Sequence, residues 1–107
     1  MIIDVLGTPY TIKKSNSVEF PNLENCDGCC DHTSKTIVID TFERYNGQSD
    51  ALDNLGEYEK KVIRHELVHA FFFESGLSEL ANNEQIVDWI AYQFPKLLKA
   101  FEESNSA

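Results

Sequence analysis

The segment RHELVHAFFFESG, residues 64–76, lies in the strongest helical pattern of this chain. Apolar residues recur there at the i, i+4, i+7 and i+8 spacing of one helix face. They form two adjacent stripes, the first with Ile63, Leu67, Ala70 and Phe71 and the second with Val62, His65, His69 and Phe73. The pattern predicts a helix from about Leu55 to Ser75 that is buried on two sides. Gly76 then suits a left-handed helix stop.

Within this helix, His65-Glu66-Leu67-Val68-His69 forms an H-E-x-x-H pattern. The i, i+4 spacing places both imidazoles on one face, close enough for one Zn²⁺ to be bound by a nitrogen of each ring. Glu66 projects beside the pair, where it would act as a general base on water at the metal and return the proton to a leaving amine. The alternative is that both histidines pack in the core and hydrogen-bond to neighbours.

A second helix is expected from about Asn83 to Gln93, with Asn82 or Asn83 as its cap and Glu84 in its first turn. Glu84 and Asp88 share one face of it, and a catalytic zinc needs a third protein ligand. Alternatively, Glu84 is an acid favoured by the helix dipole and Asp88 is solvated. Pro95 predicts a break or kink, followed by a short last helix to about Phe101 and a frayed tail over residues 102–107.

Upstream, the first forty residues carry alternating and β-branched runs that predict three or four short strands. The runs comprise Ile2, Ile3 and Val5, then Tyr10 and Ile12, then Val18 and Phe20, then Thr36 to Ile39. Gly7-Thr8-Pro9 predicts a turn between the first two runs, and Asn22 to Ser34 an ordered loop. The predicted fold is α+β: one domain over residues 1–107, strand-rich over 1–47 and helical over 50–103.

H-E-x-x-H on one helix, followed by N-E-x-x-x-D on the next, resembles the gluzincin metallopeptidases typified by thermolysin. The resemblance covers about Tyr58 to Phe94 and implies a zincin-like fold in which a small sheet packs on the two metal-ligand helices. It implies one Zn²⁺ per chain, bound by His65, His69 and Glu84, with Asp88 as the acceptor that orients His65. It also implies an edge strand that pairs with the substrate main chain, and Lys35 to Asp40 is placed to supply it through Ile37, Val38 and Ile39.

The small size and the string HELVHAFFFESGL are similar to short metallopeptidase-like proteins of phages and prophages. Larger gluzincins have a downstream Tyr or His that stabilises the oxyanion, and that region is absent here. The remaining candidates are His32, Tyr45, Tyr58 and Tyr92. Loss of such a donor costs roughly 10²–10³ in turnover, so weak or latent activity is expected.

Cys26, Cys29, Cys30 and His32 are crowded into a short segment. They could bind a second zinc, but adjacent Cys29 and Cys30 must point apart, and no second pair of ligands closes the site. Their spacing favours buried small thiols in a loop. A third interpretation is thiol regulation, in which one thiolate reaches the catalytic zinc and holds the enzyme latent.

The amino-acid composition disfavours some classes of binding partner. Acidic residues outnumber basic ones by 18 to 9, and the net charge of −9 disfavours nucleic acid and anionic lipid. No apolar run approaches the ~20 residues of a membrane span, and three crowded cysteines do not form a secreted disulfide framework, so we expect a soluble, cytoplasmic protein. A homodimer, or autoinhibition by the C-terminal tail in the cleft, is compatible with the sequence.

Three functions follow from these patterns. The leading hypothesis is a zinc-dependent hydrolase that cleaves peptide bonds with Glu66 as general base. The first alternative is a non-catalytic protein, of phage or prophage type, that zinc stabilises. The second is an acidic interaction module that sequesters a basic partner.

Overall fold

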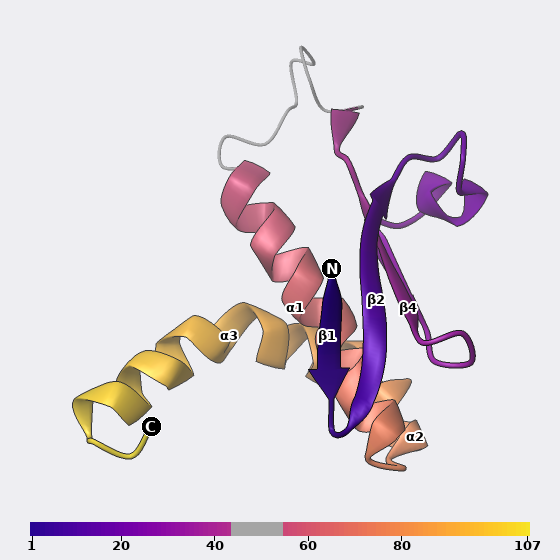
Figure 1. The fold of residues 1–107 in the computed structure, drawn as a ribbon. Coiled ribbons are helices and arrows are strands. Elements are labelled where there is room, and N and C mark those ends of the chain that lie inside the picture. Colours follow the sequence, from indigo (N-terminus) through magenta and orange to yellow (C-terminus); the bar gives the residue numbers. More distant parts are fainter. Residues whose placement is uncertain (44–54) are drawn as a thin grey trace.

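The computed structural model describes residues 1–43 and 55–107, which form a four-stranded mixed sheet and a helical layer (Figure 1). The elements are β1 (Ile2–Val5), β2 (Thr8–Ser15), the 3₁₀ helix η1 (Pro21–Glu24), β3 (Gly28–Asp31), β4 (Thr36–Asp40), α1 (Leu55–Glu74), α2 (Ser78–Ala81) and α3 (Glu84–Glu103). The predicted α+β class is confirmed, as are the predicted bounds of α1 to within a residue.

The sheet has the strand order β1-β2-β4-β3. Strands β1 and β2 form a hairpin, whose turn is Leu6-Gly7 rather than the predicted Gly7-Thr8-Pro9, because Val5 already pairs with Thr8. Both turn residues have positive φ, 52° and 89°, as the tight turns between twisted strands require. Asp4 supports the turn, since its Oδ2 accepts a hydrogen bond from the Gly7 amide at 3.1 Å.

Three further predictions for this half of the chain are wrong. Residues Val18 to Phe20 form no strand, because Asn16 Oδ1 accepts the amides of both Val18 and Glu19 at 3.0 Å and turns the chain. The missing strand lies instead in the predicted loop, where Gly28–Asp31 pairs with β4 as β3. Consequently β4, hydrogen-bonded to β2 on one side and β3 on the other, lies inside the sheet and is no edge strand.

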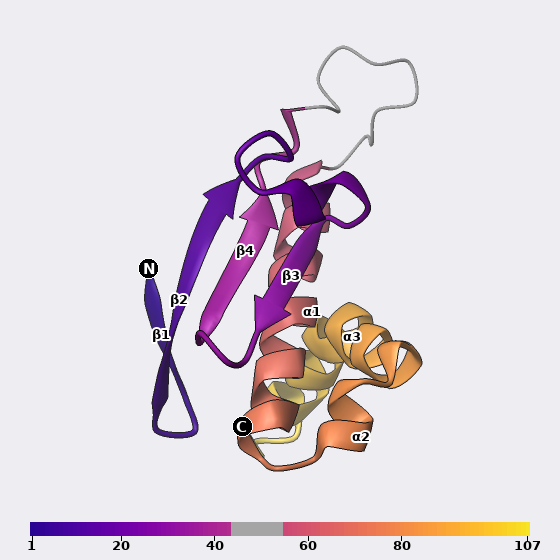
Figure 2. The same cartoon turned by 90° about the vertical axis from the view of Figure 1, so that its right-hand side faces the viewer.

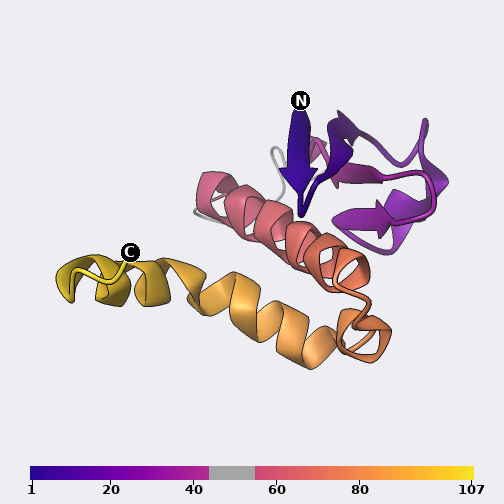
Figure 3. The same ribbon diagram turned by 60° about the horizontal axis from the view of Figure 1, so that its bottom comes forward.

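Helix α1 lies between the sheet and α3, as the two apolar stripes predict (Figure 3). The main core forms where α1 packs on the sheet. It contains Val5, Tyr10, Ile37, Ile39, Phe42, Val62 and Ala70, each at most 5% exposed. Strand β3 runs along α1 at the edge of the sheet that is nearest to α3 (Figure 2). This arrangement leaves the free edge of β3 beside the two helices that carry the predicted metal ligands.

Asn83 caps α3, with its Oδ1 accepting the Ile86 amide at 3.2 Å. Of the break or kink predicted at Pro95, the break and the separate last helix are wrong, because α3 continues through Pro95 to Glu103. The kink stays a prediction. The proline lacks the amide that would bond to the Ala91 carbonyl, and Arg64 of α1 supplies a donor instead, Nε to O 2.7 Å. None of the helices in the two described ranges combines the length and apolarity needed to cross a bilayer.

Candidate metal centre

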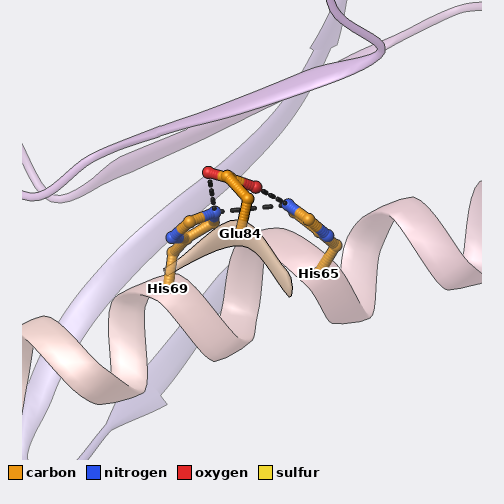
Figure 4. Close-up of side chains that lie close together, drawn as sticks. All are labelled: His65, His69 and Glu84. Atoms are coloured by element: carbon orange, nitrogen blue, oxygen red, sulfur yellow. Dashed lines mark hydrogen bonds and ion pairs between the residues drawn. The ribbon is translucent and has the colours of Figure 1, made fainter. Parts of the chain in front are cut away.

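Three side chains from two helices converge at the predicted metal site (Figure 4). His65 and His69 stand one turn apart on α1, and Glu84 is the first residue of α3. The two Nε2 atoms are 3.2 Å apart, and the Glu84 carboxylate lies 2.9 Å from Nε2 of His65 and 3.1 Å from Nε2 of His69. Their ligand atoms all lie within 4.8 Å of one another, as the ligands of a single ion must.

The chain reversal between the helices brings Glu84 to this position. Gly76 adopts φ 77° and ends α1, and the Leu77 amide bonds back to the Phe72 carbonyl at 2.9 Å. The short helix α2, which the sequence pattern did not predict, follows at once and leads to the Asn83 cap. Glu84 therefore begins α3 directly opposite the histidine face of α1.

The other ring nitrogen of each histidine faces an acceptor. Nδ1 of His69 lies 2.6 Å from the main-chain carbonyl of Ala81, which can only accept a hydrogen bond, so this nitrogen carries the proton. Nδ1 of His65 lies 3.1 Å from Asp88 Oδ1, and a hydrogen bond from Lys61 lowers the pKa of Asp88. Both Nε2 atoms therefore present lone pairs to the same point, as zinc-ligating histidines do. The donor set fits a divalent cation.

Exposure differs among the three predicted ligands. The side chains of His65 and His69 are 17% and 11% exposed, whereas that of Glu84 is 69% exposed. The site therefore opens toward solvent on the Glu84 side. A structural zinc is enclosed by four protein ligands, while a catalytic zinc keeps one position for water or substrate. Among the residues described, three protein ligands and an open side resemble the second arrangement.

Glu66 is the buried carboxylate beside this group, only 6% exposed. Its Oε2 lies 4.0 Å from Nε2 of His65. Burial, with a further contribution from the negative charge of Glu84, raises the pKa of Glu66 to about 7, although Lys61 acts in the opposite direction. A carboxyl group of this kind can take up and release a proton near neutral pH, as general base catalysis requires.

A cleft of about 500 Å³ opens over these residues, between β3 and the two long helices. Besides the ligand group and Glu66, its walls include Asp27, Cys29, Cys30, Tyr58, Lys61 and Phe73. Of the three candidate oxyanion donors that the structure describes, Tyr58 alone lines the cleft, and its hydroxyl donates to Asp27. The His32 ring stacks on the Phe73 ring, with the two ring centroids 4.1 Å apart. Tyr92 is 61% exposed on α3, and Tyr45 lies outside the described residues.

The three cysteines lie at the other wall of the cleft, and none of them forms a disulfide. Burial raises the pKa of Cys29 to about 11 and that of Cys30 to about 12, which opposes the thiolate form. Cys26 Sγ donates to the Asn22 carbonyl at 3.0 Å. Over the described ranges, His65, His69 and Glu84 are the one group found with metal-ligand spacing, so the second zinc site at Cys26, Cys29, Cys30 and His32 is not formed. Thiol regulation stays a prediction.

The predicted substrate strand needs a correction. Ile37, Val38 and Ile39 are at most 3% exposed and belong to β4 in the interior of the sheet, where their main chain is already paired. The strand that borders the cleft is β3, through Cys29 and Cys30. Its sequence Gly-Cys-Cys-Asp has little strand propensity, so the sequence pattern gave no signal for it.

No protein-family model matches this chain, and comparisons with curated proteins and with solved structures found no significant match. The functional argument therefore depends on the geometry of the site.

Proposed function

We propose that this chain is a zinc-dependent hydrolase, a minimal gluzincin-type metallopeptidase. The main supporting observation is the convergence of two Nε2 lone pairs and one carboxylate, with each Nδ1 atom held by an acceptor. The two Nε2 atoms lie 3.2 Å apart. Histidines that only packed in a core would have no need to direct both lone pairs to one shared point. The sequence resemblance to gluzincins assigns these same residues to the metal.

Zinc is the metal that the donor set favours. Two imidazole nitrogens and one carboxylate oxygen are the ligands of the His₂Glu class of catalytic zinc sites. A bound zinc ion would polarise a substrate carbonyl and lower the pKa of a coordinated water. One ion per chain is expected, because the described residues bring together one such group.

Glu66 would act as the general base. It accepts a proton from the attacking water and passes it to the leaving amine, which a carboxyl group with a pKa near neutrality can do in both directions. Burial of Glu66 favours this role over the non-catalytic alternative, because a zinc site that only stabilises the fold has no use for a desolvated carboxylate. The positive charge of Lys61 favours the ionised form of Glu66 and so partly opposes the rise in its pKa.

A peptide would bind in the cleft as an added strand. β3 pairs with β4 along one side, so the main chain of its other side borders the cleft. Strand addition there would supply main-chain hydrogen bonds to a peptide in extended conformation. β3 thus takes the role that the sequence had assigned to Ile37–Ile39. A cytoplasmic location and a phage or prophage origin stay predictions from the sequence.

The test compares the parent chain with Glu66→Gln. We expect both to bind one zinc ion by elemental analysis and only the parent to hydrolyse a peptide library, since glutamine cannot take the proton. Glu79→Gln, a change at an exposed residue of α2, is the matched control and should behave as the parent.

The alternatives give different results in the same experiment. Zinc in the parent without hydrolysis would favour the zinc-stabilised interaction protein. Absence of zinc from the parent would refute the metal site and favour the acidic interaction module. Equal hydrolysis by Glu66→Gln and the parent would remove Glu66 from the mechanism.

A further inference from the structure

Gly28, the first residue of β3, lies where the edge strand meets α1 (Figure 2). A Cβ atom at this position would come within 3.0 Å of Val62 Cγ1, 3.1 Å of Glu66 Cγ and 3.2 Å of Ile39 Cδ1. These separations are shorter than normal contacts between carbon atoms, which lie at about 3.5–4.0 Å. Any side chain at residue 28 would therefore have to displace one of its neighbours.

The neighbour of chemical interest is Glu66. Its Cγ atom carries the carboxylate directly, so a shift of Cγ moves the carboxylate with it. The side chain is nine-tenths buried and lies between α1 and the sheet, which limits its alternative rotamers. The missing side chain of Gly28 thus leaves the space through which Glu66 extends toward the cleft.

We infer that Gly28 is a positioning residue for Glu66: by bringing β3 close to α1 without a side chain, it fixes the Glu66 carboxylate beside the His65, His69 and Glu84 group. The catalytic consequence rests on the proposed function. The same close approach puts the outer edge of β3 next to that carboxylate, so one glycine sets the spacing between the proposed substrate strand and the proposed base.

Backbone conformation does not account for this glycine. Gly7 and Gly76 have positive φ, which explains their residue type, whereas Gly28 does not. Its need for glycine comes from space alone. Gly56, in the first turn of α1, has no heavy atom within 4 Å of an added Cβ and offers a matched control for the same substitution.

A second substitution separates the contact with Val62 from the contact with Glu66. Val62→Ala removes the Cγ1 atom, which is the nearest atom to an alanine Cβ at residue 28, but it leaves the contacts with Glu66 Cγ and Ile39 Cδ1. If Gly28 only serves packing, Gly28→Ala/Val62→Ala should recover everything that Gly28→Ala loses. If Gly28 positions Glu66, the double variant should recover thermal stability and nothing else.

The experiment measures zinc content, thermal unfolding and the affinity of zinc-loaded protein for acetohydroxamate by calorimetry. Acetohydroxamate binds a catalytic zinc and hydrogen-bonds to the neighbouring base, so its affinity reports on the Glu66 position without turnover. Glu66→Gln sets the scale of that loss. We expect Gly28→Ala to keep one zinc ion and to lose about tenfold or more in acetohydroxamate affinity and in kcat. Gly56→Ala should match the parent in zinc content, acetohydroxamate affinity and kcat.

The inference is overturned if Gly28→Ala binds acetohydroxamate as tightly as Gly56→Ala, or if the double variant regains the affinity along with the stability. Should Gly28→Ala fail to fold, the double variant carries the test, because the alanine at residue 62 removes the shortest contact. A parent that binds zinc and acetohydroxamate but cleaves no peptide would contradict the proposed function, while the affinities would still decide the role of Gly28.

Discussion

Asp88 connects Lys61 to His65, which is one of the proposed metal ligands. Its Oδ1 accepts a hydrogen bond from the Lys61 ammonium group and lies 3.1 Å from His65 Nδ1. The hydrogen bond from Lys61 lowers the pKa of Asp88, so the carboxylate stays ionised and can hold the proton of His65 on Nδ1. Acceptors of this kind raise the basicity of a metal-binding imidazole. Lys61 should therefore influence metal affinity although it is not a ligand.

Replacing Lys61 tests this link. We expect Lys61→Met to weaken zinc binding by up to about tenfold, because Asp88 then loses the partner that fixes it. Competition with a chromophoric chelator measures the affinity. Lys60→Met is the control, since the Lys60 side chain is 67% exposed and pairs only with Glu57, at 3.4 Å, among the described residues. Equal affinities in the two variants would show that Asp88 needs no help from Lys61.

At the residue level, the sequence predicted those parts of the site that depend on local helix geometry. His65, Glu66 and His69 follow from spacing within one helix, whereas the roles of Glu84 and Asp88 on the next helix were implied by the resemblance to gluzincins. The Ala81 carbonyl that holds His69 could not be predicted, because it depends on how α2 reverses the chain. Gly28 could not be predicted either, since its importance comes from a contact between distant segments.

A hydrogen bond from α1 replaces the main-chain hydrogen bond that Pro95 removes from helix α3. Pro95 leaves the Ala91 carbonyl without its usual amide donor, and sequence rules therefore predict a break. Arg64, on α1, donates to that carbonyl and lets α3 continue. The sequence contains both residues, but only the packing of α1 against α3 brings them together.

A double-mutant cycle tests the compensation. We expect Arg64→Met to lower the free energy of unfolding by about 1–3 kcal/mol, because a carbonyl within the α1–α3 contact loses its partner. In a Pro95→Ala background the new amide satisfies Ala91, so the same substitution should cost less. Urea denaturation of the four proteins measures the coupling. Additive effects would mean that Arg64 stabilises the helices by packing alone.

The sheet illustrates a second limit of prediction. The β-branched run of β4 was recognised, but its place between β2 and β3 was not, because strand order depends on long-range pairing. Residues Val18 to Phe20 have more strand propensity than Gly28–Asp31, yet the Asn16 turn excludes the former and pairing with β4 recruits the latter.

The sheet and the end of α1 are also joined by a polar contact. Glu74 accepts hydrogen bonds from Lys35 at 2.6 Å and from the Tyr10 hydroxyl at 3.0 Å. The hydrogen bond from Lys35 lowers the pKa of Glu74, with Tyr10 adding to the effect. Because the folded-state pKa is depressed, this contact stabilises the fold above the ordinary glutamate pKa of about 4.3 and is lost as pH falls through the folded value.

The expected result is a pH-dependent effect of Glu74→Gln. At neutral pH the variant should be less stable than the parent in urea denaturation, and the difference should shrink below about pH 4, where the parent carboxylate becomes protonated. Glu57→Gln, at an exposed position 3.4 Å from Lys60, should change stability little at any pH. A Glu74→Gln deficit that stays constant with pH would assign the effect to shape rather than charge.

At the scale of the whole molecule, α3 extends away from the body after its first turns (Figure 1). Val87 and Ala91 are fully buried against the rest of the fold, whereas Phe94, Leu97, Leu98 and Phe101 are each about 40% exposed. Its 20 residues span about 30 Å, so residues 104–107 lie far from Glu84 and do not occupy the cleft in cis. The homodimer stays a prediction.

Because the three proposed ligands come from α1 and α3, a bound zinc ion would tie the first turn of α3 to the middle of α1. An ion that binds only the folded chain adds stability by mass action, about 2.7 kcal/mol at a hundredfold excess over its Kd. For a domain of this size the melting temperature should then fall by on the order of 10 °C when a chelator removes the metal. His69→Ala should melt at one temperature with or without chelator, because it has lost a ligand. Calorimetry with parallel metal analysis makes the comparison. A parent that loses its zinc and melts unchanged would show that the ion does not hold α3 to α1.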